Sequence, residues 1–140
     1  MKKITVGNYR TDKYYLRVVN AVKAILARKE FVSPVELFVE MGLLSSQEIA
    51  EWRAGRVPYL ERVIKCNLSA ASRILRLLRM HAHDLNLRPS STGYVRRTRG
   101  GKPRLRFTKT GDLKLEDAYA RHFVKVVSDR KSRRDSILLK

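Results

Sequence analysis

The residues best suited to metal or nucleophile chemistry are His81, His83 and Cys66. Two histidines that stand two positions apart on a helix point in different directions, so they cannot close on one ion unless a third ligand comes from elsewhere. Cys66 lies about four helical turns from His81 if the intervening helix is continuous, which is too far for a Cys–His nucleophile pair. We therefore expect these residues to be structural, with Cys66 buried and inert.

Adjacent acids offer one remaining route to catalysis. Glu116 and Asp117 stand at the start of a predicted helix, where favourable interaction with the helix dipole accounts for acidic side chains. The sequence has no Walker loop, no dinucleotide fingerprint and no CxxC pair, so no cofactor is expected. An enzyme is the less favoured class. The one enzyme function still considered is a metal-dependent nucleic-acid-processing activity, in which these acids or the histidines are ligands of a divalent cation.

Cationic side chains point to a different chemistry, the binding of phosphates. The chain carries 31 Lys and Arg against 13 Asp and Glu, a net charge of +18, and such an excess attracts polyanions. Residues 31–60 are acidic, whereas residues 71–110 contain many cations and Asp84 as their only acid. The predicted nucleic-acid-binding residues are Arg73, Arg76, Arg79, Arg96, Arg97, Arg99, Lys102, Arg104, Arg106 and Lys109.

A long amphipathic helix over residues 58–87 is expected to position the first three of these arginines. Its apolar residues recur at steps of three and four, which places them on one buried stripe and leaves the arginines on or near the other side. Pro58 suits a first helical turn, and no Pro or Gly follows before Pro89. A break at Asn67-Leu68-Ser69 is the alternative, so the stretch forms either one helix or two.

A two-stranded basic β-hairpin over residues 92–110 is expected to position the other cations. The Gly-Gly pair at its centre allows the positive φ angles that a tight reversal demands. In the second strand, alternation puts Leu105 and Phe107 on one face. Arg104 and Arg106 then take the other face, so at least one side of the hairpin is a ladder of cations.

Two short helices and a tight turn are predicted before the basic helix. The first helix ends at Gly42, and Ser45 with Glu48 offers a capping box for the second. The residues of the pattern are Gly42, Leu43, Ser45, Ile49, Trp52, Gly55 and Pro58. With them the stretch from Leu37 to Pro58 resembles the helix-turn-helix of repressor-type DNA-binding proteins. Because carboxylates on the second helix would face phosphates, base readout is not expected there and Trp52 is expected to be a core anchor.

The basic helix and the segments after it form a second pattern. Residues 72–79, then Arg96 to Lys109, and then Thr110-Gly111-Asp112 are similar to the recognition helix, the wing and the following turn of winged-helix proteins. This resemblance implies a DNA-binding domain, with DNA favoured over RNA and transcriptional regulation as a role. If the helix breaks near Asn67, the groove-facing residues implied are Ser69, Ser72, Arg73 and Arg76.

The rest of the chain completes one domain. Further helices are predicted from about Asp12 to Lys29 and from Asp112 through Val127, and residues 1–128 form a single globular domain. Residues 129–140 are a basic tail whose last apolar residues could dock on the body or on another subunit, which leaves a homodimer open. The start lacks the apolar run of a secretory signal, and no segment approaches the ~20 apolar residues that span a bilayer, so a cytoplasmic protein without an integral membrane segment is expected.

Together the elements predict an α+β, mostly α fold, in which about five helices surround the long central helix (58–87) with the basic hairpin (92–110) beside it. The predicted function is nucleic-acid binding through phosphates. One alternative is a protein-interaction or assembly module, in which the acidic residues 31–60 and the basic hairpin pair with another subunit or an acidic partner. The other alternative is the metal-dependent enzyme.

Overall fold

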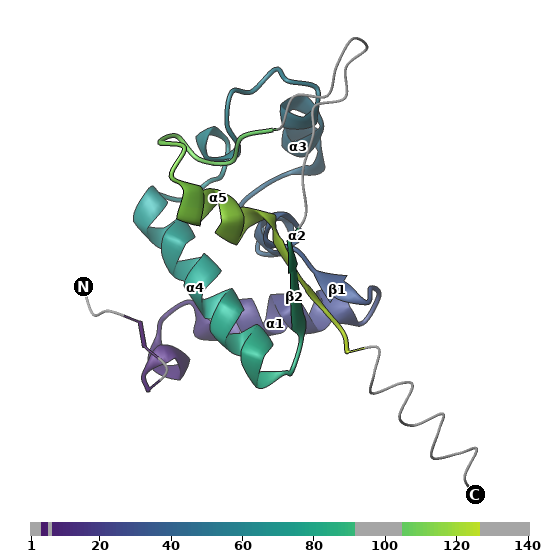
Figure 1. Ribbon diagram of the computed structural model, residues 1–140, viewed down its shortest axis with the longest axis vertical. Helices are drawn as coiled ribbons and strands as arrows, with labels where there is room; N and C mark the ends of the chain where they lie inside the picture. Colours follow the sequence, from purple (N-terminus) through teal and green to yellow (C-terminus); the bar gives the residue numbers. More distant parts are fainter. Residues whose placement is uncertain (1–3, 6, 92–104, 127–140) are drawn as a thin grey trace, which may run out of the picture.

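Five α-helices and a small antiparallel sheet make up the described part of the chain in the computed structural model (Figure 1). The structure describes residues 4–5, 7–91 and 105–126. In chain order the elements are η1 (Tyr9–Thr11), α1 (Tyr15–Leu26), β1 (Phe31–Val32), α2 (Pro34–Glu40), α3 (Ser46–Arg53), η2 (Leu60–Arg62), α4 (Leu68–Asp84), β2 (Arg88–Ser91), α5 (Leu113–Ala120) and β3 (Arg121–Val124), where η marks a short 3-10 helix. The prediction of an α+β, mostly helical fold is confirmed.

The sheet joins three segments that are distant in the sequence. Its strand order is β1-β3-β2, and β3 runs antiparallel to both neighbours. Phe123 of β3 lies opposite Val32 of β1 and Pro89 of β2. The sheet therefore ties the segment after α5 to the segments that follow α1 and α4 (Figure 1).

The central helix is shorter than predicted. α4 begins after Asn67, whose side-chain oxygen accepts a hydrogen bond from the backbone N–H of Ala70 at 2.7 Å. An Asn in this position favours a helix start, because its side chain satisfies an amide that has no partner inside the helix. The prediction of one helix over 58–87 is therefore wrong, and the alternative break at Asn67-Leu68-Ser69 is confirmed.

The residues before Asn67 take another course because their amides bond elsewhere. The backbone N–H groups of Leu60 and Glu61 donate to the carbonyls of Arg106 and Phe107, at 3.1 and 2.9 Å. Only η2 is helical in this stretch, and it is a single short turn. Leu60 is nevertheless fully buried, so the apolar spacing identified a core position without identifying the local structure.

The predicted two-stranded hairpin over 92–110 is not confirmed. Residues 92–104 lie outside the described residues, and residues 105–110, the rest of its second strand, pair with no described strand. Side chains satisfy part of this backbone instead. Trp52 Nε1 donates to the carbonyl of Arg106 at 2.8 Å, and Glu116 accepts from the N–H of Thr108 at 2.7 Å. A segment tied in this way has less need of a partner strand.

The last helix ends earlier than predicted. α5 begins after Asp112, whose carboxylate accepts from the N–H of Leu115 at 3.4 Å, as the sequence indicated. It ends at Ala120, and residues 121–124 continue as β3. A strand between two others forms backbone hydrogen bonds on both sides, so tertiary pairing replaces one more helical turn. The predicted helix through Val127 is therefore wrong for residues 121–124.

The two short helices before Pro58 are confirmed. α2 is followed by Gly42, with a φ of 77°, in the left-handed region that favours glycine. Ser45 and Glu48 form the predicted capping box at the start of α3. Trp52 on α3 has no exposed surface, and its ring centroid lies 5.0 Å from that of Phe107. Trp52 is thus the core anchor that the sequence predicted.

Candidate functional site

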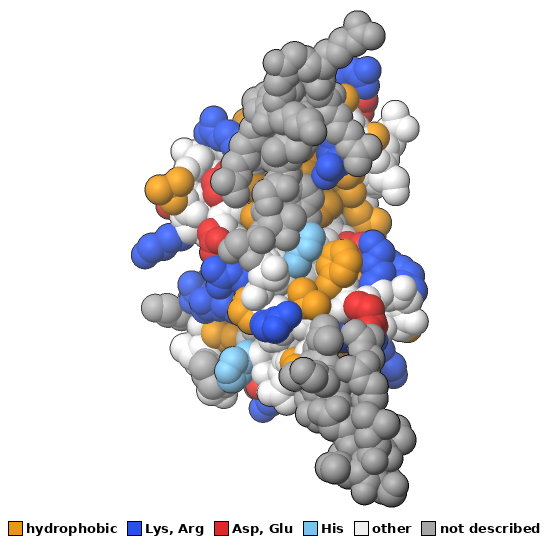
Figure 2. All heavy atoms as spheres, turned by 45° about the vertical axis from the view of Figure 1, so that its right-hand side comes forward, with side chains coloured by type: hydrophobic (Ala, Val, Ile, Leu, Met, Phe, Trp, Pro, Cys, Tyr) orange, Lys and Arg blue, Asp and Glu red, His pale blue; other side chains and the backbone are white. Residues whose placement is uncertain are grey.

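Lys and Arg side chains are spread over the described surface. Figure 2 shows them at several separate places on one face, with fewer Asp and Glu side chains between them. A net charge of +18 for the whole chain makes this excess expected. Charge alone therefore does not locate a binding site, and a site has to be sought where cations meet a concave surface.

The acidic region of residues 31–60 is neutralised by cations of the same chain. Each of its glutamates forms an ion pair with a Lys or Arg. The pairs are Glu36 with Lys29, Glu40 with Arg28, Glu48 with Lys65, and Glu51 with Arg56. This region consequently offers little unbalanced negative charge to a partner.

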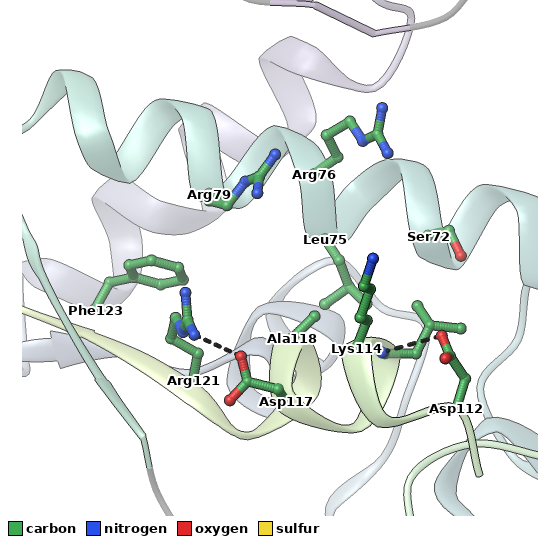
Figure 3. Close-up of a pocket in the computed structure, with 11 residues that line it drawn as sticks. Ser72, Leu75, Arg76, Arg79, Asp112, Lys114, Asp117, Ala118, Arg121 and Phe123 are labelled. Carbon is green, nitrogen blue, oxygen red and sulfur yellow. Dashed lines mark hydrogen bonds and ion pairs between the residues drawn. The ribbon is translucent and has the colours of Figure 1, made fainter.

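A groove of about 460 Å³ runs between α4 on one side and α5 with β3 on the other (Figure 3). Apolar side chains from all three elements form its base, among them Leu75, Ala118 and Phe123. Leu75 and Phe123 are each 6% exposed, so only their edges reach the groove. The full lining is Ser72, Leu75, Arg76, Arg79, Asp112, Lys114, Leu115, Asp117, Ala118, Arg121 and Phe123.

Four cations line the two walls of this groove. Arg76 and Arg79 stand three positions apart on α4, so their side chains leave the same side of the helix. Lys114 near the start of α5 and Arg121 at the start of β3 belong to the opposite wall. Figure 3 shows Lys114 pointing from α5 toward α4. An anion placed between the walls would lie close to cations from both.

The two carboxylates of the groove are engaged with other groups. Asp117 forms an ion pair with Arg121 at 2.5 Å. Asp112 caps α5 by accepting from the N–H of Leu115. This single hydrogen bond leaves the negative charge of Asp112 in place, so one carboxylate stands against the remaining three cations of the lining.

Those three cations have no ion pair within residues 4–5, 7–91 and 105–126. Arg76 donates to the carbonyl of Ile4 at 3.4 Å, which is a long hydrogen bond. Arg79 and Lys114 are exposed, as Arg76 is. Like charges gathered in a groove raise the local positive potential, and an anionic ligand relieves it.

Arg73, the first of the predicted phosphate-binding residues, is used inside the fold. Its guanidinium forms an ion pair with Asp12, and the two side chains are 16% and 2% exposed. Asp12 also accepts from the backbone N–H of Tyr14 at 2.9 Å. A buried carboxylate needs a cation beside it, so the charge of Arg73 is largely balanced by Asp12. Arg73 is also absent from the lining of the groove.

Arg106 and Lys109 lie at the turn that precedes α5. The guanidinium of Arg106 donates to the carbonyl of Thr108 at 2.8 Å and also to that of Lys109, so it closes its own turn. Neither residue lines the groove. The predicted residues outside the described part of the chain are Arg96, Arg97, Arg99, Lys102 and Arg104. Of the ten predicted cations, the structure brings Arg76 and Arg79 into the groove.

Sequence reasoning missed Lys114 and Arg121. A signal for them existed, because residues 114, 118 and 121 follow one another at steps of four and three within the helix predicted after Asp112. That spacing places both cations on one face beside Ala118. What the spacing could not show is that this face lies opposite Arg76 and Arg79.

Two carboxylates hold the segment that leads into α5. Glu61 accepts from the N–H of Lys109 and from the hydroxyl of Tyr119, both at 2.9 Å. Burial, and then the Glu61 carboxylate, raise the pKa of Tyr119 far above its usual value, so the phenol stays protonated and donates. Glu116 accepts from the N–H and the hydroxyl of Thr108, at 2.7 and 2.6 Å. Glu116 is thereby committed to the fold.

Metal and membrane sites are not found among the described residues. Within them, no three His, Cys, Asp or Glu side chains are placed to hold a metal ion. His81 is buried, and its ring centroid lies 6.1 Å from that of Tyr15, whereas His83 is exposed. No helix in the same residues is long and apolar enough to cross a membrane.

We expect His81 to make the stability of the fold depend on pH. Burial, and then the Arg10 guanidinium, lower the pKa of His81 below 6.5. As the pH falls, the unfolded chain takes up the proton first, so this contribution is complete above about pH 6.5 and is lost below it. The free energy of unfolding, measured in denaturant on either side of that pH, should fall less for His81→Leu than for the unchanged protein. Equal losses would contradict this expectation.

No protein-family model matches the chain, and no curated protein or solved structure matches it. The comparisons therefore assign no family and no activity. The function has to be argued from the groove and from the charges around it.

Proposed function

We propose that the protein binds nucleic acid and holds phosphates in the groove between α4 and α5. The main support is that Arg76, Arg79 and Lys114 line one groove from two helices, and that no described carboxylate forms an ion pair with them. Guanidinium and ammonium groups form charge-assisted hydrogen bonds with phosphate oxygens. A phosphate in the groove would therefore receive donors from both walls.

The charge of the whole chain favours a polyanion over a small anion. Each contact between a Lys or Arg and a phosphate releases counterions, so an extended anion gains from cations that a single phosphate cannot reach. On sequence grounds, the segment between β2 and Leu105 adds further cations, and so does the tail. Those of the segment are Arg96, Arg97, Arg99, Lys102 and Arg104.

A finer form of the proposal names DNA as the partner and transcriptional regulation as the role. Its support is the sequence pattern that resembles winged-helix proteins, together with the helix pair α2 and α3 before it. A homodimer through the apolar end of the tail is a further expectation of the same kind. Phosphate contacts position a protein on nucleic acid without reading bases, so no target sequence is proposed.

The competing function, a protein-interaction module, has less support. It relied on the acidic residues 31–60 as one half of a charged interface. Because each glutamate of that region already forms an ion pair within the chain, an acidic docking surface there would first have to break those pairs.

Salt titration of a groove variant tests the proposal. We expect Arg79→Gln/Lys114→Gln to bind an oligonucleotide more weakly than the unchanged protein. The slope of log K against log salt should shrink by about 1.4 to 1.8, because each lost phosphate contact removes about 0.7 to 0.9. Fluorescence anisotropy at several salt concentrations measures both quantities.

A matched control removes the same charge elsewhere. Lys23 and Arg62 are exposed and do not line the groove, so Lys23→Gln/Arg62→Gln should leave the salt slope nearly unchanged. If the two double variants lose affinity and slope equally, binding is a diffuse effect of net charge. If neither variant changes the slope, the proposal is wrong.

A further inference from the structure

The shape of the groove restricts the form of nucleic acid that can enter it. Cations stand on both walls, and apolar side chains form the base between them (Figure 3). Leu115 and Ala118 are partly exposed there, so apolar surface is accessible as well as charge. The groove therefore combines a place for a phosphate with a place for a flat, weakly polar group.

The volume of the groove suits an occupant the size of one small group. About 460 Å³ falls within the range of roughly 300 to 1,000 Å³ that is typical of sites for single small molecules. A base in a duplex is stacked on its neighbours and paired with the other strand. Such a base can enter the groove only by leaving the stack, and the unstacking and unpairing cost free energy. An unpaired base enters without the cost of unpairing.

We infer that the groove takes one unpaired nucleotide of a single strand. This inference rests on the proposed binding of nucleic acid, specifies its ligand, and replaces the finer winged-helix form of that proposal. The phosphate lies between Arg79 on α4 and Lys114 on α5, and the base lies against the apolar surface at Ala118. Proteins that bind single strands combine a cationic groove with aromatic side chains on which bases stack; in this groove the accessible surface is aliphatic, with the edge of Phe123 beside it. Since the base of the groove is apolar, little discrimination between bases is expected.

Filling the groove without changing its charge tests this inference. Ala118→Leu adds volume from α5, and Ser72→Leu adds it from the exposed side of α4, where it disturbs no packing. At one salt concentration, we expect a single-stranded oligonucleotide to bind the unchanged protein about tenfold or more tightly than the duplex of the same sequence. Each filling variant should lower single-strand affinity about tenfold and leave duplex affinity unchanged.

Four control measurements separate the outcomes. Ala27→Leu adds the same side chain at an exposed position outside the groove and should bind as the unchanged protein does. Thermal unfolding shows whether either groove-filling leucine variant has lost its fold. Arg79→Gln/Lys114→Gln should lower affinity for both forms of nucleic acid, because it removes charge. A free 5′-mononucleotide should displace the strand only weakly, since it lacks the contacts of neighbouring phosphates.

Each contrary result has one meaning. Duplex affinity equal to or above single-strand affinity overturns the inference and leaves the proposed function standing. The same holds if both groove-filling leucine variants weaken both forms equally, or if a mononucleotide displaces the strand fully at a comparable concentration. Binding of an acidic peptide in place of either form, with no effect of the charge variant on nucleic acid, overturns the proposed function as well.

Discussion

Arg73→Met is expected to lower the free energy of unfolding by about 3 to 5 kcal/mol, because it leaves the carboxylate of Asp12 buried without a cation. The side chain of Asp12 is 2% exposed, so water cannot replace the lost guanidinium. A loss of this size is a large part of the stability of a typical domain, which is about 5 to 15 kcal/mol. Urea unfolding at neutral pH, followed by circular dichroism, measures it.

Two further variants show whether the missing ion pair is the cause. Asp12→Asn/Arg73→Met removes both charges and should regain most of the loss, since Asn can still accept from the N–H of Tyr14. Arg76→Met removes an exposed arginine from the same helix and should change stability by no more than about 0.5 kcal/mol. If Arg73→Met costs no more than Arg76→Met, the pair does not stabilise the fold. A phosphate-binding role for Arg73 would then regain support.

The helical elements illustrate what a sequence pattern determines and what it leaves open. The spacing located most of the buried positions, since Leu60, Ala71 and Leu78 are buried, but Leu68 and Leu85 of the same stripe are each 44% exposed. Their common spacing suited one helix, but Leu60 is buried through a different backbone path. Asn67 decided the local structure, because a capping side chain competes with continuation of a helix. Periodicity therefore indicates most buried positions, whereas the start of this helix is determined by a single residue.

The sheet could not have been predicted from local patterns. β3 follows α5 directly, and its residues continue the helical spacing of apolar residues. It becomes a strand because β1 and β2, which lie far away in the sequence, provide partners on both sides. Preference for a strand is therefore a property of the assembled fold, and tertiary context outweighs local propensity here.

The candidate site shows the same limit for charge. The sequence identifies cations, but it does not show that Asp12 pairs with Arg73 or that Arg106 bonds to its own turn. It also gave no reason to place Lys114 opposite Arg79. Composition predicts a polyanionic partner, and the packing of α5 beside α4 indicates which cations such a partner could reach.

Glu116→Leu is expected to lower the free energy of unfolding by about 3 kcal/mol, because it leaves the N–H and the hydroxyl of Thr108 without their acceptor. Thr108 has no exposed surface, so water cannot take the place of the carboxylate. The leucine matches the glutamate roughly in size, which separates the loss of hydrogen bonds from the loss of packing. Urea unfolding of both proteins gives the difference.

Glu116→Gln is the matched variant. Its amide oxygen can still accept from both donors of Thr108, so we expect a loss of only about 1 kcal/mol. Equal losses for the two variants would mean that the negative charge, and not the acceptor, stabilises the turn. Because this turn leads directly to Asp112 and the start of α5, Glu116→Leu should also weaken oligonucleotide binding through Lys114, although no cation has been removed.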